Sequence, residues 1–195
     1  MQLEWALRDE YAEIGGTSLL HEAVGEALAV LPREHLRQLA VISVQDEDPR
    51  GKALGIWRQD HRGVGIELYA RPHVTPLLGL PGEVRRFALR LHLAYTLFHE
   101  AGHHVTRFLN KRAAPPRKAA LVEQKIERWA DDYAERRLVK LTERWQKPGG
   151  LAATPEARLA LELALKALRM DSIVARETAE TKRETAGTKV AEAAS

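Results

Sequence analysis

The sequence predicts an α+β fold in which a small, mainly antiparallel three-stranded sheet packs on one long helix, with additional C-terminal helices. The chain has 195 residues, of which 45% are apolar, and this is enough for one domain with its own core. Short β-branched runs separated by turn residues occupy 39–70, and after Pro81 the apolar residues recur at the spacing of helices. We therefore assign residues 1–170 to a single domain and 171–195 to a polar, flexible C-terminal tail.

The first half of the chain predicts one helix and three strands. Apolar residues lie on one face of a helix over 17–31, which makes this segment amphipathic. The β-branched run 39–44 is typical of a buried strand. The runs 53–58 and 64–70 flank a short polar segment, which predicts a β-hairpin. We expect 64–70 to be an edge strand to which an extended peptide can add.

Helices dominate the second half. A long helix is expected over 83–110, followed by helices over 119–146 and 155–170, each ended by proline, glycine or polar residues. The loop Lys111–Lys118 between the first two carries four positive charges and no aromatic residue. Because nucleic-acid sites interleave stacking residues with the charges, we interpret this loop as a solvated surface segment.

Composition excludes several classes of protein. The chain has no cysteine, which rules out disulfide frameworks, thiolate metal sites and cysteine nucleophiles. Its 30 basic and 27 acidic residues are interspersed and leave a net charge of only +3, so no nucleic-acid partner is expected. The sequence has neither a membrane-spanning apolar run nor the pattern of a signal peptide, which predicts a cytoplasmic protein without a membrane partner. The composition does not define an oligomeric state.

The strongest chemical signal is the sequence His99-Glu-Ala-Gly-His103, inside the expected helix 83–110. Positions i and i+4 share one helix face, so both imidazoles can bind one zinc ion, while Glu100 is rotated by about 100° and can reach a water molecule. Gly102 either lets another helix approach closely or is tolerated at a cost of about 1 kcal/mol. The competing interpretation, two core histidines and a buried glutamate, would require several costly buried polar groups.

A third zinc ligand must come from elsewhere in the chain. Leu109 stands where an extended zinc motif would have a third histidine, so a carboxylate from the helix 119–146 remains. Glu127 is the favoured ligand, and Glu123, one turn earlier, competes with it. Asp131, one turn after Glu127, can accept a hydrogen bond from the far nitrogen of a ligand histidine. The alternative is that these acids form a solvated helix face.

The segment Glu127-Arg-Trp-Ala-Asp-Asp-Tyr-Ala134 begins 24 positions after His103. Together with the His-Glu-Ala-Gly-His segment it resembles the short gluzincin metallopeptidases, especially the ImmA/IrrE-type family with its HExGH and E-x-x-A-[ND]-x-[FY]-A elements. The resemblance implies a minimal zincin core over about 39–138 and one Zn²⁺ per chain. It further implies zinc ligation by His99, His103 and Glu127, a catalytic carboxylate at Glu100, and a supporting role for Asp131. Relatives often add a helix-turn-helix segment or a sensor module, and this sequence shows neither.

The predicted activity is zinc-dependent hydrolysis of peptide bonds in a peptide or protein substrate, with Glu100 taking the proton from the attacking water. A further donor would stabilise the oxyanion, and spacing does not choose among the candidates His104, Tyr133, Tyr69 and His73. The alternative is a non-catalytic zincin-like regulatory or protein-binding module that retains zinc. Glu100 argues against this alternative, because a structural zinc site needs no general base.

Overall fold

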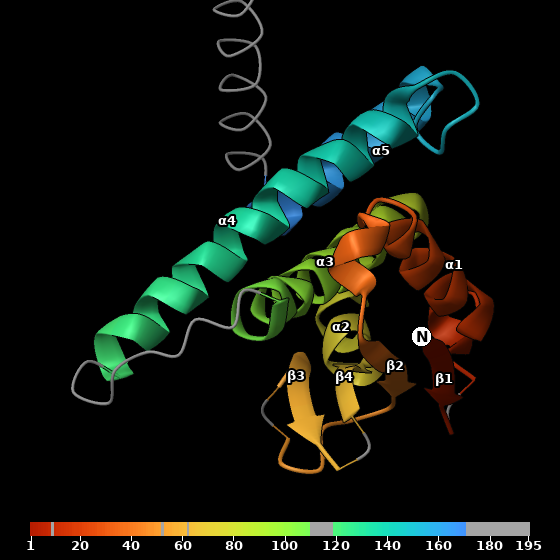
Figure 1. Ribbon diagram of the computed structural model, residues 1–195. Helices are drawn as coiled ribbons and strands as arrows, with labels where there is room; N and C mark the ends of the chain where they lie inside the picture. Colours follow the sequence, from red (N-terminus) through yellow and green to blue (C-terminus); the bar gives the residue numbers. More distant parts are fainter. Residues whose placement is uncertain (9, 52, 62, 110–118, 171–195) are drawn as a thin grey trace, which may run out of the picture.

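The structure, a computed structural model, describes residues 1–8, 10–51, 53–61, 63–109 and 119–170 (Figure 1). The predicted basic loop Lys111–Lys118 and the predicted tail 171–195 lie outside the described residues. Within the described part of the chain, no helix is both long and apolar enough to cross a membrane.

The sheet has four strands and mixed pairing. The strands are β1 (Gln2–Ala6), β2 (Leu39–Gln45), β3 (Gly55–Asp60) and β4 (Gly63–Tyr69), and their order across the sheet is β1-β2-β4-β3. β1 pairs with β2 and β2 with β4 in parallel, whereas β3 and β4 form the antiparallel hairpin that the sequence predicted.

Two expectations about the sheet were wrong. The predicted three-stranded, mainly antiparallel sheet is a four-stranded mixed sheet, because residues 2–6 add a strand and both β1 with β2 and β2 with β4 pair in parallel. The segment 64–70 is not an edge strand, because β4 hydrogen-bonds to β2 on one side and to β3 on the other. Its last residue, Ala70, already begins a helix. The free edges belong to β1 and β3.

The α-helices in the described part of the chain are α1 (Thr17–Leu28), α2 (Ala70–Val74), α3 (Gly82–His103), α4 (Ala119–Gln146) and α5 (Pro155–Ala167). Of these helices, α2 was not predicted, and the other four follow the predicted order with some different ends. The helix expected to reach residue 110 changes at His104 into a π-helical turn that continues to Leu109. α4 has the predicted bounds, because apolar periodicity defines its length and the Pro-Gly-Gly segment that follows ends it.

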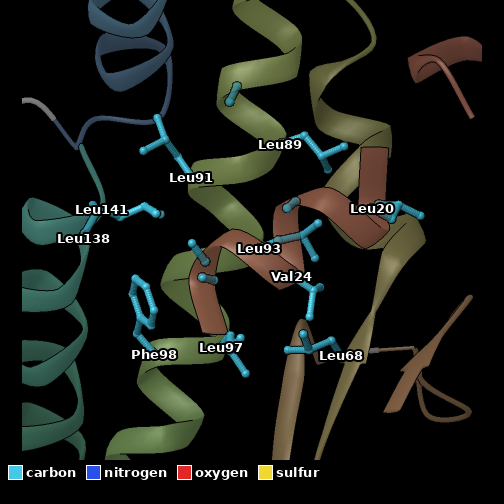
Figure 2. Close-up of a cluster of buried hydrophobic side chains, with 14 of the residues drawn as sticks. Leu20, Val24, Leu68, Leu89, Leu91, Leu93, Leu97, Phe98, Leu138 and Leu141 are labelled. Atoms are coloured by element: carbon cyan, nitrogen blue, oxygen red, sulfur yellow. The ribbon is translucent and has the colours of Figure 1, made fainter. Parts of the chain in front are cut away.

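α3 lies at the centre of the molecule. Figure 2 shows its leucines and Phe98 between α1 on one side and α4 on the other, with Leu68 of β4 packed below. Leu89, Leu91 and Leu97 are completely buried, as expected for a helix that is covered on most of its circumference. The last turn of α3 is therefore held by a packed frame on several sides, and this turn carries the His-Glu-Ala-Gly-His segment.

Candidate metal centre

The last turn of α3 presents two imidazoles to one point. His99 and His103 are one turn apart, and their Nε2 atoms lie 3.0 Å from each other. The two rings are almost perpendicular, at 85°, with centroids 4.7 Å apart. Both side chains are largely buried, with exposed fractions of 20% and 9%. This arrangement realises the i, i+4 geometry that the sequence predicted.

α4 adds a carboxylate to the same point. The Oε2 atom of Glu127 lies 3.4 Å from His99 Nε2 and 3.5 Å from His103 Nε2, so the three atoms form a nearly equilateral triangle. Tetrahedral zinc with metal–ligand bonds of about 2.05 Å requires ligand atoms about 3.3 Å apart. The triangle already has these dimensions. Glu123, the competing ligand of the sequence prediction, is not part of this cluster.

Asp131 fixes the orientation of one imidazole. Its Oδ1 atom accepts a hydrogen bond of 2.9 Å from His99 Nδ1, which leaves the lone pair of Nε2 directed at the cluster. The Tyr95 hydroxyl donates to the same carboxylate oxygen at 3.3 Å. Sequence reasoning missed Tyr95, although it lies four positions before His99 on the same helix stripe and could have been found by that spacing.

A close helix–helix contact brings α4 to this position. A Cβ atom added to Gly102 would lie 2.9 Å from the Cα atom and 3.2 Å from the Cβ atom of Ala130. The two backbones therefore approach more closely than any larger pair of residues would permit. The sequence left two explanations open for Gly102, and the structure supports the close approach of a second helix. This contact places Glu127, one turn before Ala130, within reach of the histidines.

Glu100 occupies a different position from the three cluster residues. Its side chain is buried, with 8% exposed, and Oε2 accepts a 2.6 Å hydrogen bond from the backbone N–H of Trp57 in β3. The carboxylate between the two histidines thus belongs to the interface between α3 and the sheet edge. Trp57 is a second residue that the sequence analysis missed, because no local pattern links positions 43 residues apart.

His104 was a candidate oxyanion donor and is instead bound inside the protein. It is fully buried, and its Nε2 atom donates to the Arg37 carbonyl oxygen at 2.9 Å. Its Nδ1 atom accepts a hydrogen bond of 3.4 Å from the indole N–H of Trp57. Burial lowers the pKa of His104 below its usual value, so the ring is neutral and acts as one donor and one acceptor.

The other three candidates also have partners within the protein. The hydroxyl of Tyr133 lies 2.7 Å from Nδ1 of His35, and the hydroxyl of Tyr69 donates to Glu67 at 2.9 Å. Burial raises the pKa of both phenols. His73 is completely buried, and its Nε2 atom donates to the Leu54 carbonyl oxygen at 3.3 Å. The hydrogen-bond partners of these groups given above lie outside the His99, His103 and Glu127 cluster, so these bonds do not identify an oxyanion donor.

The cluster is accessible from outside along α4. A shallow hollow beside it is lined by Glu123, Gln124, Glu127, Arg128 and Asp131. Glu127 and Asp131 are about half exposed, with fractions of 46% and 50%. The cluster is thus enclosed by the protein on the α3 side and open on the α4 side. A site open on one side leaves room for a molecule to approach the three cluster residues.

Comparison with known proteins gives no family assignment. No protein-family model, no curated protein and no solved structure matches this chain.

Proposed function

We propose that the protein is a zinc-dependent metallopeptidase of the minimal zincin, gluzincin type, with one zinc ion per chain. The observation that carries this proposal is the triangle of His99 Nε2, His103 Nε2 and Glu127 Oε2, with sides between 3.0 and 3.5 Å. Two imidazoles and one carboxylate form the ligand set of many catalytic zinc sites, which keep a fourth position for water or substrate.

The chemistry of the ligand set fits zinc. Each of the three atoms carries a lone pair, and the bond between Asp131 and His99 fixes the tautomer that a metal ligand requires. Three lone pairs that converge at this distance repel one another unless a proton or a cation lies between them. When bound, zinc would lower the pKa of a water molecule and polarise a substrate carbonyl.

Glu100 supplies the proton transfer in this proposal. Its carboxylate takes a proton from the water that attacks the peptide carbonyl, and then delivers that proton to the leaving amine nitrogen. Glu100 is suited to this role because it neighbours ligand His99 in sequence but is held by Trp57, outside the group of three metal ligands. A zinc site that served only stability would have no use for this carboxylate.

The substrate would be an extended peptide segment. β3 is an edge strand next to the last turn of α3, and an extended chain could add to its outer side beyond Trp57, whose N–H is taken by Glu100. This assigns to β3 the role that the sequence analysis had given to 64–70.

The proposal is tested by separating metal binding from turnover. We expect protein purified without chelators to contain about one zinc per chain and to cleave an unfolded protein such as reduced casein. Glu100→Gln should keep the zinc and lose cleavage by at least about 100-fold, because general acid–base catalysis contributes that much. Glu143→Gln, on the exposed face of α4, is the matched control and should keep both properties.

Two other results would contradict the proposal. Zinc binding without cleavage of a broad peptide library would favour the non-catalytic binding module. Protein that takes up no zinc even at excess metal would rule out both functions and leave the two histidines as packing residues.

A further inference from the structure

A second feature of the site concerns the edge of the sheet at Trp57. The N–H of Tyr69 donates to the Leu54 carbonyl oxygen. In an antiparallel pair every second residue of a strand bonds to the partner strand, so the main-chain groups of Ile56 and Arg58 also face β4. The N–H of Trp57 therefore points away from β4, to the free side of the sheet. Glu100 Oε2 accepts this N–H at 2.6 Å, a short hydrogen bond of the kind that a charged acceptor forms.

The indole of Trp57 has its own anchor. Its Nε1–H donates a hydrogen bond to His104 Nδ1 at 3.4 Å. The other ring nitrogen of His104, Nε2, donates to the Arg37 carbonyl oxygen at 2.9 Å. His104 directly follows the metal-ligand turn of α3, and Arg37 directly follows the short helix Arg33–Leu36. The Trp57 side chain is thus bound directly to His104, and through His104 to Arg37.

A steric contact fixes the position of β3 along the axis of α3. A Cβ atom added to Gly55 would lie 2.7 Å from Cγ2 of Thr96, so strand and helix touch there. Gly55 precedes Trp57 by two residues and Thr96 precedes Glu100 by four. Two strand residues span about 6.6 Å and one helical turn spans about 5.4 Å, so the distance from Gly55 to Trp57 is close to that from Thr96 to Glu100. Contact at Gly55 therefore places the Trp57 N–H level with Glu100.

We propose that Trp57 is a positioning residue for Glu100, and that His104 acts through Trp57. The main-chain N–H holds one carboxylate oxygen of Glu100, which restricts the directions available to the other oxygen. The bond from the indole to His104 keeps β3 in the place where this N–H can act. This inference rests on the proposed function, since it assigns a task to the residue that moves the proton.

Paired variants of His104 and Trp57 test the role. His104→Phe keeps a ring but removes the acceptor, and Trp57→Phe keeps the main-chain N–H but removes the indole donor. In the zinc-loaded protein we expect each to lower kcat about 10-fold with zinc content unchanged, because the carboxylate that moves the proton loses its position while the metal ligands keep theirs. The double variant should lose no more than either single variant, because both remove the same bond.

Conservative replacement and a distant tryptophan provide the controls. His104→Gln retains an acceptor and a donor in its carboxamide, so it should restore most of the kcat that His104→Phe loses. Trp5→Phe, on the other edge strand β1, should leave kcat unchanged. Equal kcat losses for His104→Gln and His104→Phe would show a role in packing alone and overturn the inference.

The contact can also be tested without measuring turnover. We expect the Trp57 amide to exchange its hydrogen slowly in the wild type, and at least about 10-fold faster in Glu100→Ala, because the acceptor is lost. The Ile56 amide, which faces β4, should exchange at the same rate in both proteins. An unchanged Trp57 rate would overturn the inference.

The two proposals fail in different ways. If zinc-loaded wild-type protein cleaves no peptide, the proposed function is wrong. If the wild type cleaves peptide and His104→Phe cleaves it equally fast, the proposed function stands and the positioning role is wrong.

Discussion

Two polar clusters lie along α3, and they satisfy their buried groups in different ways. Near the middle of the helix, the Arg90 guanidinium contacts Glu22 at 2.6 Å and Glu26 at 3.3 Å, both from α1. At the end of the helix, His99 and His103 meet Glu127 of α4. The first cluster contains its own cation. The second brings together three atoms with lone pairs, which a divalent metal could satisfy all at once.

The two clusters show that buried polar groups can either hold helices together or form a candidate chemical site. At Arg90, opposite charges fasten one helix to another, and the side chain is 9% exposed. Burial raises the pKa of Glu26 despite the opposing effect of Arg90. At the histidines, the distances between the atoms are closer to one value than a contact between two helices requires, because three atoms from two helices lie at the spacing of zinc ligands. Four predictions would break or sharpen this distinction.

The largest effect is expected for Glu127→Ala. Removing one of three ligands should reduce the zinc content from about one per chain to nearly zero at micromolar zinc, because two imidazoles alone bind zinc weakly. Metal analysis after dialysis measures this. Glu123→Ala is the matched control, one turn earlier on the same helix, and should keep its zinc. The opposite result for the two variants would make Glu123 the ligand.

Arg90→Met should lower the free energy of unfolding by about 2 kcal/mol, because Glu26, 27% exposed, and Glu22, 56% exposed, lose the buried cation that pairs with them. Zinc content should not change, and urea unfolding provides the measurement. Arg86→Met is the control: its pair with Glu83 is exposed, at 54% and 68%, and should be worth less than about 1 kcal/mol. Loss of zinc from Arg90→Met would show that the two clusters are coupled.

Gly102→Ala should affect both stability and metal binding. The new methyl group meets the backbone of Ala130, so α3 and α4 must separate, at a cost of about 2 kcal/mol. The same displacement moves Glu127 away from the histidines and should weaken zinc binding about 10-fold. Gly79→Ala, where nothing lies within 4 Å, is the control. Wild-type zinc affinity in Gly102→Ala would mean that the helix contact does not position the ligand.

The smallest effect concerns pH and His73. Burial, reinforced by His92, lowers the pKa of His73 to about 3, so the folded protein keeps it neutral. The unfolded chain takes up a proton near pH 6.5 and therefore binds more protons, so stability is lost as the pH falls below about 6.5. Between pH 7 and pH 5.5 this one group should cost about 1 kcal/mol.

Urea unfolding at both pH values should show a smaller loss for His73→Gln than for the wild type, with exposed His61→Gln as the control. Equal losses in all three proteins would exclude His73 as the source.

Local signals predicted the four longer helices and the hairpin, but not the short helix α2 or the contacts between distant segments. The bounds of α4 follow from periodicity and from the Pro-Gly-Gly end, both of which lie in the sequence itself. β1 was missed because it is short and mostly exposed, so it lacks the apolar pattern of a buried strand. Its parallel pairing with β2 joins residues 39 positions apart, and no local rule selects such a partner.

In the candidate site too, local sequence patterns predicted some residues and missed others that depend on distant contacts. The motif placed His99 and His103, because helix geometry relates residues four apart. Glu127 remained one of two choices until the structure brought it, and not Glu123, to the imidazoles. The bonds from Tyr95 to Asp131 and from Trp57 to Glu100 depend on how helices and sheet pack. Sequence reasoning therefore found the three cluster residues and Asp131, but not Tyr95 and Trp57.

The contact between Gly102 and Ala130 also sets a condition on evolution. Since neither backbone can withdraw without moving Glu127 relative to the histidines, both positions should remain small among related sequences. A mutation to a bulkier residue at one of them would have to be preceded by a compensating shift of the whole helix. Distant relatives are therefore better sought by this pair of small residues together with the histidines than by the five-residue motif alone.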